Sequence, residues 1–365
     1  MSDLIVSPFL GEYLVVRPGH KRAVKISGTQ YREIAQTPVL PAWFNQLCIQ
    51  AWDCERGSIT VRSESILGFG KASYELNLGC NYDCEHCYLG LKQFEGLNWP
   101  NREILLEYMR DAGVLWLQLT GGEPMIDKLF ADVYAKAHEL GMMIEILTNG
   151  SRLGDPRVLS MLTARKPSRV IVSIYGATEE SYDGLTRRPG SYRKFIRALT
   201  AANEAGIRLE LSLIITARNE HEKAQMRDLA RRFGRISGEY GNISPTIYGG
   251  AGNLPSQSPQ FLRTRKPFTG CSAGHTSFHV DPFGKASICK IGREPHIDLL
   301  TEGPFALARL GKIGNDLLLR QEGCTGCALQ GTCGTCMPLV QLHRKANAPL
   351  STYCQHQEPR EEVRA

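Results

Sequence analysis

The chain has 365 residues with 42% hydrophobic and 22% charged side chains, a composition typical of globular proteins that excludes collagen-like, coiled-coil and disordered chains. Its 43 Lys and Arg against 37 Asp and Glu give a formal net charge of +6, an excess too small and scattered to favour nucleic acid as a partner. No apolar run approaches the ~20 residues that cross a bilayer, and the first residues lack the pattern of a secretory signal, so we expect a cytoplasmic protein with no membrane partner.

At roughly 100–200 residues per domain the length allows two or three units. The first is predicted over residues 1–70 as a small α+β domain. Its strands, Tyr13–Val16 and Ala23–Ile26, flank a turn with Pro and Gly, which is typical of a hairpin. A helix over Trp43–Trp52 follows, and it carries Cys48 on its apolar face as a core thiol.

Residues 71–250 alternate between short apolar runs and amphipathic stretches, a rhythm that predicts parallel βαβ units. The expected strands are Tyr74–Leu78, Leu115–Thr120, Met143–Thr148, Val170–Tyr175, Leu209–Thr216 and Ile243–Tyr248. The expected helices cover residues 101–112, 127–140, 155–165, 191–205 and 221–233. An open sheet and a closed or partly closed barrel share this pattern, and in both the ligands bind at the carboxyl ends of the strands.

Residues 251–365 are predicted as a linker rich in Gly, Pro and Ser that leads into a largely irregular, cysteine-rich domain. Two strands, Thr276–Val280 and Ala286–Cys289, are expected there around a turn with Pro and Gly.

The twelve cysteines of the chain are clustered, which points to metal rather than to disulfides. A reducing compartment does not support a disulfide framework in a chain of this size. Cys48 and Cys54 stand apart, and Cys54 has no assigned role. The other cysteines form two groups: Cys80, Cys84 and Cys87, and Cys271, Cys289, Cys324, Cys327, Cys333, Cys336 and Cys354.

The first group, Cys80-Asn-Tyr-Asp-Cys84-Glu-His-Cys87, follows the first strand of the middle region. A [4Fe–4S] cluster normally takes four thiolates, so three leave one iron open, and an open position is what makes a metal site catalytic. Two other interpretations remain: three buried cysteines without metal, and a zinc site completed by His86.

This spacing, C-x3-C-x2-C after the first strand of a six-fold βα unit, resembles the radical S-adenosylmethionine (SAM) enzymes. The second strand runs into Gly121-Gly122-Glu123-Pro124, similar to the GGEP motif with which the family contacts the amino group of SAM. Glycines let the backbone approach a ligand, and the proline stiffens the loop. The resemblance implies an α/β fold, a partial (β/α)6 barrel, that binds SAM and a [4Fe–4S] cluster at the three cysteines.

Four further residues would contact SAM according to this resemblance. Asn149 ends the third strand and Ser173 the fourth, where the family places polar groups near the ribose, and Arg187 could pair with a carboxylate. His86 stands where the family usually has an aromatic residue, and its planar ring could cover the adenine. N-caps and a solvated basic loop are the structural alternative for these positions.

The second cysteine group resembles the SPASM extension of radical SAM enzymes, which holds two auxiliary clusters, although the final pair has two intervening residues where the extension usually has three. The resemblance implies an outer cluster on Cys324, Cys327, Cys333 and Cys354. It implies an inner cluster on Cys271, Cys289 and Cys336, with an open iron or a non-cysteine ligand in the last position. Two zinc knuckles are the alternative.

SPASM enzymes mostly modify peptides and proteins. The resemblance implies that a 5′-deoxyadenosyl radical abstracts hydrogen from a ribosomally made peptide to give a cross-link or another oxidative modification. A precursor peptide and a low-potential reductant such as ferredoxin or flavodoxin are the implied partners. The N-terminal unit is similar in kind to the winged-helix leader-recognition domain of peptide maturases, which would bind the leader as an added strand. A plain cover for the lower end of the barrel is the other interpretation.

Other functions stay open at the level of sequence. As an enzyme, the chain could instead form formylglycine in sulfatases or build a peptide-derived cofactor. As a protein without turnover, it could bind iron–sulfur clusters or zinc. The sequence identifies no general base, no particular substrate and no particular bond.

Overall fold

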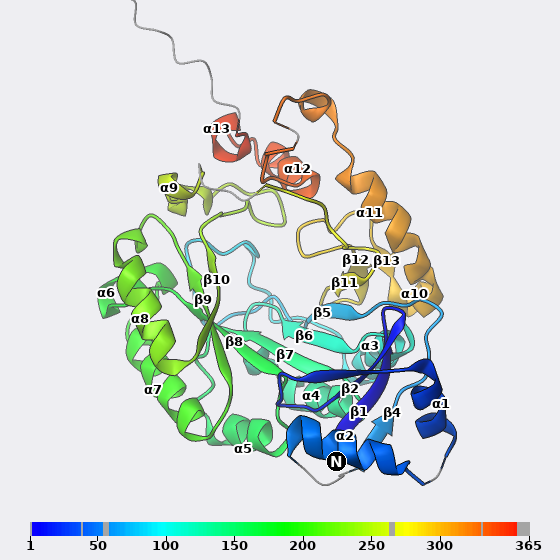
Figure 1. Cartoon of the computed structure of the whole chain (residues 1–365). Helices are drawn as coiled ribbons and strands as arrows, with labels where there is room; N and C mark the ends of the chain where they lie inside the picture. Colours follow the sequence, from blue (N-terminus) through cyan, green and yellow to red (C-terminus); the bar gives the residue numbers. More distant parts are fainter. Residues whose placement is uncertain (1, 38, 54–57, 263–266, 330, 356–365) are drawn as a thin grey trace, which may run out of the picture.

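The computed structural model describes residues 2–37, 39–53, 58–262, 267–329 and 331–355, so that Cys54 lies outside the described residues. A four-stranded sheet near the N-terminus and a nine-stranded sheet organise the chain (Figure 1). The N-terminal unit, in blue, lies at one end of the larger sheet, and the cysteine-rich tail, in orange and red, lies at the other.

The N-terminal sheet has the strand order β3-β2-β1-β4. The elements of this unit are β1 (Ser2–Phe9), β2 (Glu12–Val16), β3 (Ala23–Ile26), α1 (Gly28–Gln36), α2 (Ala42–Trp52) and β4 (Ser58–Val61). Side chains alternate along β1: Leu4 and Val6 pack in one core with Cys48 of α2, whereas Ile5 packs on Leu115 and Met143. The sheet therefore lies between its own helices and the amino ends of the barrel strands.

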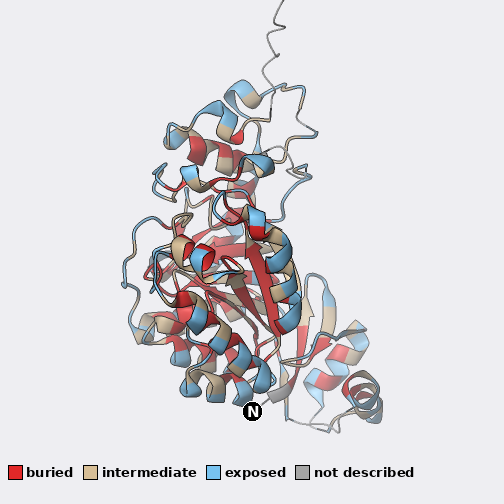
Figure 2. Cartoon of the chain, turned by 90° about the vertical axis from the view of Figure 1, so that its left-hand side faces the viewer, coloured by how far each residue is buried: buried red, intermediate tan, exposed pale blue. Residues whose placement is uncertain are grey.

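Six parallel strands form the partial barrel in the order β10-β9-β8-β7-β6-β5. They are β5 (Lys71–Glu75), β6 (Trp116–Thr120), β7 (Met143–Thr148), β8 (Arg169–Ile174), β9 (Leu209–Ile214) and β10 (Arg235–Tyr240). The helices are α3 (Trp99–Asp111), α4 (Phe130–Glu139), α5 (Pro156–Ala164), α6 (Glu179–Thr186), α7 (Ser191–Glu204) and α8 (Lys223–Phe233). Figure 2 shows buried strands behind helices whose outer faces are exposed. Because the strands are parallel, their carboxyl ends meet at one edge.

The tail adds three strands to the same sheet and continues as short helices. β11 (Ser277–Val280) pairs parallel to β5, and β12 (Lys285–Ser287) and β13 (Ile297–Asp298) follow it antiparallel. The helices are α9 (Pro259–Leu262), α10 (Leu299–Glu302), α11 (Leu310–Leu318), α12 (Met337–Lys345) and α13 (Leu350–Tyr353). This pairing brings Cys289, just after β12, near the strand that leads to Cys80.

The α/β class and the partial barrel are confirmed, but some predicted elements are wrong. The last barrel strand is β10 and not Ile243–Tyr248, where Pro245 lacks the N–H that a ladder needs. Gly238 and polar neighbours weaken the strand signal in β10 itself. α1, α6, β1 and β4 are not predicted from the sequence, and α11 and α12 form where irregular chain is predicted.

Two further points concern the chain as a whole. No helix in the described part combines the length and apolar character that crossing a bilayer requires. The domain boundaries near residues 70 and 250 stay predictions.

Candidate active site

The loop that carries the first cysteine group (residues 80–87, the Cys80 loop) follows β5 and rests on α6. The N–H of Asp83 donates to the Thr186 carbonyl at 2.9 Å. The N–H of Glu85 donates to the Leu185 carbonyl at 3.1 Å. Both acceptors lie in the last turn of α6, so this helix positions the loop.

Gly121 and Gly122 pack against the backbone that leads into the Cys80 loop. A side chain on Gly121, whose φ is +135°, would place its Cβ 2.2 Å from the Asn77 carbonyl oxygen. A side chain on Gly122 would place its Cβ 2.0 Å from the Gly79 carbonyl oxygen. Only glycine fits at either position. This glycine pair therefore brings the loop after β6 into direct contact with the segment before Cys80.

Glu123 is fully buried and ties the loop after β6 to the end of β7. Its carboxylate accepts from the Thr148 hydroxyl at 2.8 Å and from the N–H groups of Asn149 at 2.7 Å and Met125 at 3.1 Å. Burial raises the pKa of Glu123 to about 7, although these donors oppose the shift. Glu123 and the buried Pro124 lie behind the glycine pair and outside the lining of the adjacent cavity.

A cavity of about 490 Å³ opens at the carboxyl ends of the strands and continues into the barrel. Small-ligand sites have volumes of roughly 300–1,000 Å³. Arg169, Ile171 and Ser173 of β8 line it, because every second side chain of a strand points to the same face. The three cysteines of the Cys80 loop and the glycine pair border the same cavity.

Three of the four remaining predicted SAM contacts line this cavity: His86, Asn149 and Ser173. Burial lowers the pKa of His86 to about 4, and its Nδ1 has no hydrogen-bond partner among the described residues. The Asn149 amide lies 3.6 Å from the Cys80 sulfur. Arg187 is elsewhere: its side chain is 57% exposed, and its guanidinium lies 3.8 Å from Asp83.

These residues fit a bound iron–sulfur cluster and SAM. Three thiols from one loop, a glycine pair and an unpaired imidazole nitrogen face one cavity. Nowhere in the described ranges do three His, Cys, Asp or Glu side chains converge on a single ion. A four-iron cluster does not require such convergence, because each thiolate binds a different iron.

The tail cysteines lie in two places. Cys324, Cys327, Cys333 and Cys354 line a small cavity of about 40 Å³. Burial raises the pKa of Cys336, and the thiols of Cys289 and Cys271 lie near enough to raise it further. The structure thus separates the residues of the two predicted auxiliary clusters, while the binding of clusters to them stays a prediction.

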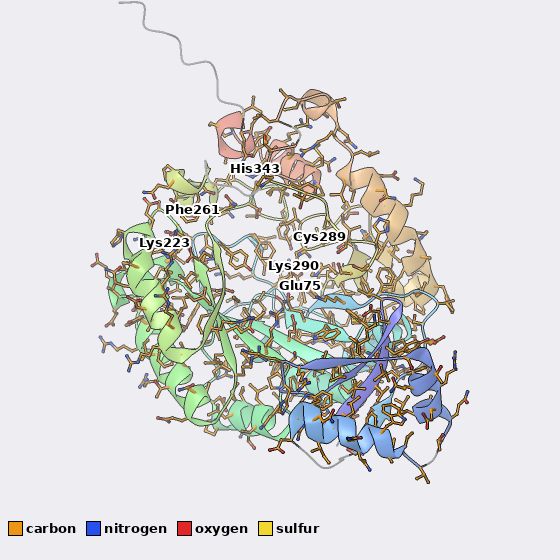
Figure 3. The ribbon with its side chains drawn as sticks, in the orientation of Figure 1. Glu75, Lys223, Phe261, Cys289, Lys290 and His343 are labelled. Atoms are coloured by element: carbon orange, nitrogen blue, oxygen red, sulfur yellow. The ribbon has the colours of Figure 1, made fainter. Side chains whose placement is uncertain are left out.

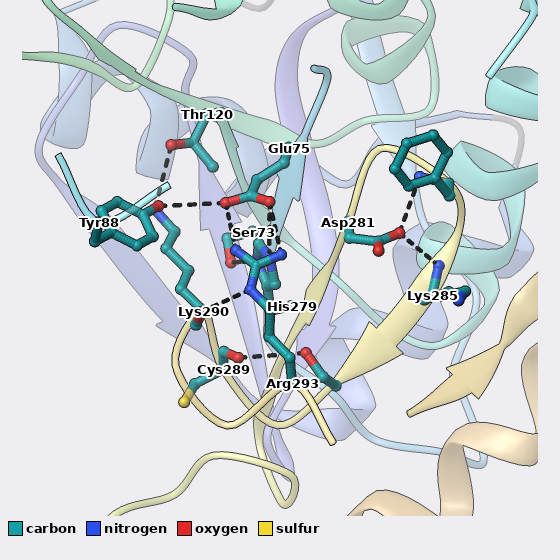
Figure 4. Close-up of polar contacts among 12 residues, drawn as sticks. Ser73, Glu75, Tyr88, Thr120, His279, Asp281, Lys285, Cys289, Lys290 and Arg293 are labelled. Atoms are coloured by element: carbon teal, nitrogen blue, oxygen red, sulfur yellow. Dashed lines mark hydrogen bonds and ion pairs between the residues drawn. The ribbon is translucent and has the colours of Figure 1, made fainter. Parts of the chain in front are cut away.

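A buried charged network joins the barrel to the tail (Figure 4). Glu75, at the end of β5, is fully buried, and its two oxygens accept from Arg293 at 2.9 and 3.0 Å. His279 lies 3.4 Å from the same carboxylate, and the Tyr88 hydroxyl donates to it at 3.2 Å. Burial alone would raise the pKa of Glu75, but His279 and Arg293 hold it well below its usual range.

Lys290 extends from the tail to the wall of the active-site cavity. Figure 3 shows Lys290, Cys289 and Glu75 near one another, between the barrel and the tail. The Lys290 ammonium donates to Gln118 Oε1 at 3.1 Å and to Thr120 Oγ1 at 3.2 Å. Burial lowers the pKa of Lys290 to about 8.

Sequence patterns alone do not mark Glu75, Tyr88, Arg293 or Lys290 as site residues. Tyr88 and Lys290 each follow a predicted cysteine ligand directly, and that adjacency is the signal that could have found them. Glu75 and Arg293 offer no such signal, because their pairing depends on the contact between β5 and β11.

Comparison with known families and proteins agrees with this geometry. The sequence model described as the Radical SAM superfamily matches residues 74–232, from β5 into α8. The matched stretch includes the Cys80 loop and the glycine pair.

Three known relatives align with this chain over about half of their own length. The mycofactocin maturase MftC of Mycobacterium tuberculosis (strain CDC 1551 / Oshkosh) is 32% identical over 169 residues, which cover 44% of this chain and 42% of the relative. An AdoMet-dependent heme synthase of Methanosarcina barkeri is 24% identical over 48% of this chain and 50% of the relative. The subtilosin biosynthesis protein AlbA of Bacillus subtilis is 22% identical over 60% of this chain and 54% of the relative.

Solved structures share the fold over a longer part of the chain. SuiB of Streptococcus suis aligns with a TM-score of 0.60 and 14% identity over 92% of this chain and 94% of SuiB. The structure of anSMEcpe with bound AdoMet aligns with a TM-score of 0.60 and 14% identity over 78% of this chain and 91% of that one. At these identities the likeness concerns the fold.

Proposed function

The chain belongs to the radical SAM superfamily through residues 74–232, and on that premise we propose that it is a peptide maturase. It would hold SAM and a [4Fe–4S] cluster at Cys80, Cys84 and Cys87 and modify a ribosomally made peptide. The chemistry that the bound pair would supply is one-electron cleavage of SAM to a 5′-deoxyadenosyl radical, which abstracts hydrogen from the substrate.

The observation that carries this proposal is the continuous cavity of about 490 Å³. At one end it has three thiols and the glycine pair, and deeper in the barrel it has polar side chains such as Gln118, Ser173 and Ser212. SAM would occupy the first part and a residue of the substrate the second. The barrel wall would exclude water and hold the reacting C–H near the radical.

Within the cavity, the residues of this chain would orient SAM rather than react with it. His86 would cover the adenine together with Tyr175, whose ring centroid lies 5.4 Å from that of His86. Asn149 and Ser173 would donate to the ribose hydroxyls. Glu123 would act indirectly, because its carboxylate joins the two loops that border the SAM site.

The N-terminal unit supports a peptide as the substrate. β3 and β4 are the edges of its sheet, and a leader peptide could add to β3 as a further strand. SuiB, whose fold covers most of this chain, has been solved bound to its precursor peptide SuiA. The same sheet also packs on the lower end of the barrel, so its role as a cover is compatible with leader binding.

The tail supports two auxiliary clusters within the same proposal. The outer group of cysteines would hold one, and Cys271, Cys289 and Cys336 would hold the other. Both auxiliary clusters would transfer electrons to or from the active site. A ferredoxin or flavodoxin would be the external reductant. A reducing cytoplasm would keep these thiols available for iron.

A second candidate is the building of a peptide-derived cofactor, which the similarity to the mycofactocin maturase supports. Both candidates share the same test of the first step. Protein reconstituted with iron and sulfide under argon, then reduced and given SAM, should release 5′-deoxyadenosine. Its absence would contradict both.

The substrate class is tested by co-expression with short open reading frames that neighbour the gene. A peptide that loses two hydrogens, detected by mass spectrometry, supports a cross-linking maturase. Conversion of a sulfatase-derived Cys or Ser peptide to formylglycine would contradict that assignment and favour sulfatase maturation.

A further inference from the structure

Two cationic side chains of the tail reach the same buried region, and only one of them meets a carboxylate there (Figure 4). Arg293 binds both oxygens of Glu75, so the two charges neutralise each other. Lys290 donates to an amide oxygen and a hydroxyl of β6, both neutral. Burial lowers the pKa of His279, while the Glu75 carboxylate opposes that shift. Among the described residues, no carboxylate lies within hydrogen-bond distance of the Lys290 ammonium.

The Lys290 ammonium lies behind two residues of the active-site cavity wall and bonds to both. Gln118 and Thr120, which accept from the Lys290 ammonium, both line that cavity. An ammonium has three donors, and these contacts use two of them. Holding a charge away from water without a directly bonded counter-charge is costly, so an anion that reached this point would be stabilised.

We propose that Lys290 is a carboxylate-binding residue and that the peptide substrate brings an acidic group to it, either its C-terminal carboxylate or the side chain of an Asp or Glu. This inference rests on the proposed function and specifies its substrate. The carboxylate accepts the remaining N–H of Lys290 in a charge-assisted hydrogen bond. That contact, on the wall formed by β6, orients the substrate within the barrel.

A role in balancing the charge of an auxiliary cluster is the competing explanation, since Lys290 follows Cys289. Figure 4 shows the Lys290 side chain extending from beside Cys289 up to Thr120, with the ammonium at the far end from the Cys289 sulfur. The charge is thus directed to the cavity. SAM also has a carboxylate that could bind Lys290, so the experiment includes a sample with SAM and no peptide probe.

The first test measures the acetylation rate of Lys290 in the reconstituted holoenzyme by peptide mapping. The probes are N-acetyl-trialanine with a free C-terminus, its C-terminal amide, and the amide of N-acetyl-Ala-Glu-Ala. With SAM present, a carboxylate probe should slow acetylation of Lys290 about tenfold relative to the neutral amide. The exposed Lys285 serves as the internal control and should react equally in every arm.

The pattern of protection identifies the source of the carboxylate. Protection by the free acid indicates the C-terminus, and protection by the glutamate peptide indicates an acidic side chain. Equal protection by acid and amide, protection by none of the probes, or full protection by SAM alone would overturn the proposal.

A second test compares binding of the acid and amide probes by equilibrium dialysis. The parent and Lys285→Met should prefer the carboxylate probe that protects Lys290 over the trialanine amide by about tenfold, and Lys290→Arg should keep a preference because it keeps the charge. Lys290→Met should bind acid and amide alike. An unchanged preference in Lys290→Met, with a shifted potential of an auxiliary cluster, would assign Lys290 to the cluster instead.

These readouts are independent of turnover. Release of 5′-deoxyadenosine by the parent tests the proposed function, whereas the acid-to-amide ratio tests Lys290. A protein that binds carboxylates through Lys290 but never cleaves SAM would contradict the proposed function and leave the assignment of Lys290 as a carboxylate-binding residue intact.

Discussion

The Cys80 loop and the outer cysteine group of the tail present thiols from different kinds of structure. The Cys80 loop leaves a strand of the barrel, and its backbone is held by α6 and by close contact with the glycine pair. The outer group lies on turns and short helices around a small buried cluster formed by Met337, Val340 and Tyr353. The barrel core, in contrast, extends over all six strands.

This difference predicts what the proposed clusters would contribute in each region. The barrel can form the Cys80 loop without metal, because its core and hydrogen bonds already fix the backbone. The small buried cluster of Met337, Val340 and Tyr353 supplies little folding free energy to the segment around the outer cysteine group, so binding of the proposed iron–sulfur cluster would supply the rest. Iron should therefore act mainly as a reactant in the barrel and mainly as a structural element in the tail.

The largest effect is expected from Cys84→Ala, which removes one thiolate from an otherwise formed loop. Formation of 5′-deoxyadenosine should fall to background, and the bound iron should fall by about four per chain. Far-UV circular dichroism should stay unchanged if the barrel forms without its cluster. Cys48→Ala is the matched control, because Cys48 is buried in the N-terminal core, and it should keep both iron and SAM cleavage.

Iron removal should separate the two regions directly. After anaerobic chelation, amides in residues 320–355 should exchange on the order of 100-fold faster, because the outer group loses its cross-link. Amides of β6, β7 and β8 should exchange at nearly the rate of the holoenzyme. Hydrogen exchange read by mass spectrometry measures both in one sample. Equal acceleration in barrel and tail would contradict the comparison.

The parts of the molecule that could be predicted from sequence have local signals. β7 occupies the predicted Met143–Thr148, because its residues form an apolar, β-branched run that only Glu145 interrupts. The Cys80 loop and the glycine pair are recognisable because each follows a strand at a fixed position. Their meeting in space follows from the parallel order of the strands.

The remaining features depend on contacts between distant segments. β11 pairs with β5 across about two hundred residues, and no local pattern specifies that partner. Glu75 and Arg293 meet only because of this pairing, and Lys290 reaches Gln118 for the same reason. The sequence contains these side chains, but it does not indicate which of them become neighbours in the fold.

Glu75→Gln should weaken the contact between the barrel and the tail. It leaves Arg293, whose side chain is only 17% exposed, without its counter-charge, and the loss of one partner of a fully buried ion pair costs up to about 3–5 kcal/mol. The thermal unfolding midpoint should fall by several degrees. Glu12→Gln, at the exposed pair of Glu12 and Lys25, is the control and should cost less than about 1 kcal/mol. A similar cost for both would show that the buried network does not join barrel and tail.

The smallest expected effect concerns the pH dependence of α6, which supports the Cys80 loop. Glu222 accepts from Thr178 at 2.6 Å, from Ser181 at 2.7 Å and from the Ala177 N–H at 2.8 Å. Burial alone would raise the pKa of Glu222, but these donors lower it below its usual value. Its unfolded pKa is about 4.3. The stabilisation is therefore complete above that pH and is lost as the pH falls through the lower folded pKa.

Glu222→Gln should remove this dependence. As the pH falls below about 4.3, the unfolding free energy of the parent should fall more steeply than that of the variant. Urea unfolding followed by tryptophan fluorescence at several pH values measures the difference. Glu180→Gln, at an exposed position of α6, should follow the parent. If Glu222→Gln falls as steeply as the parent, the hydrogen-bonded carboxylate does not stabilise this helix, and the support of the Cys80 loop must come from the packing of α6 alone.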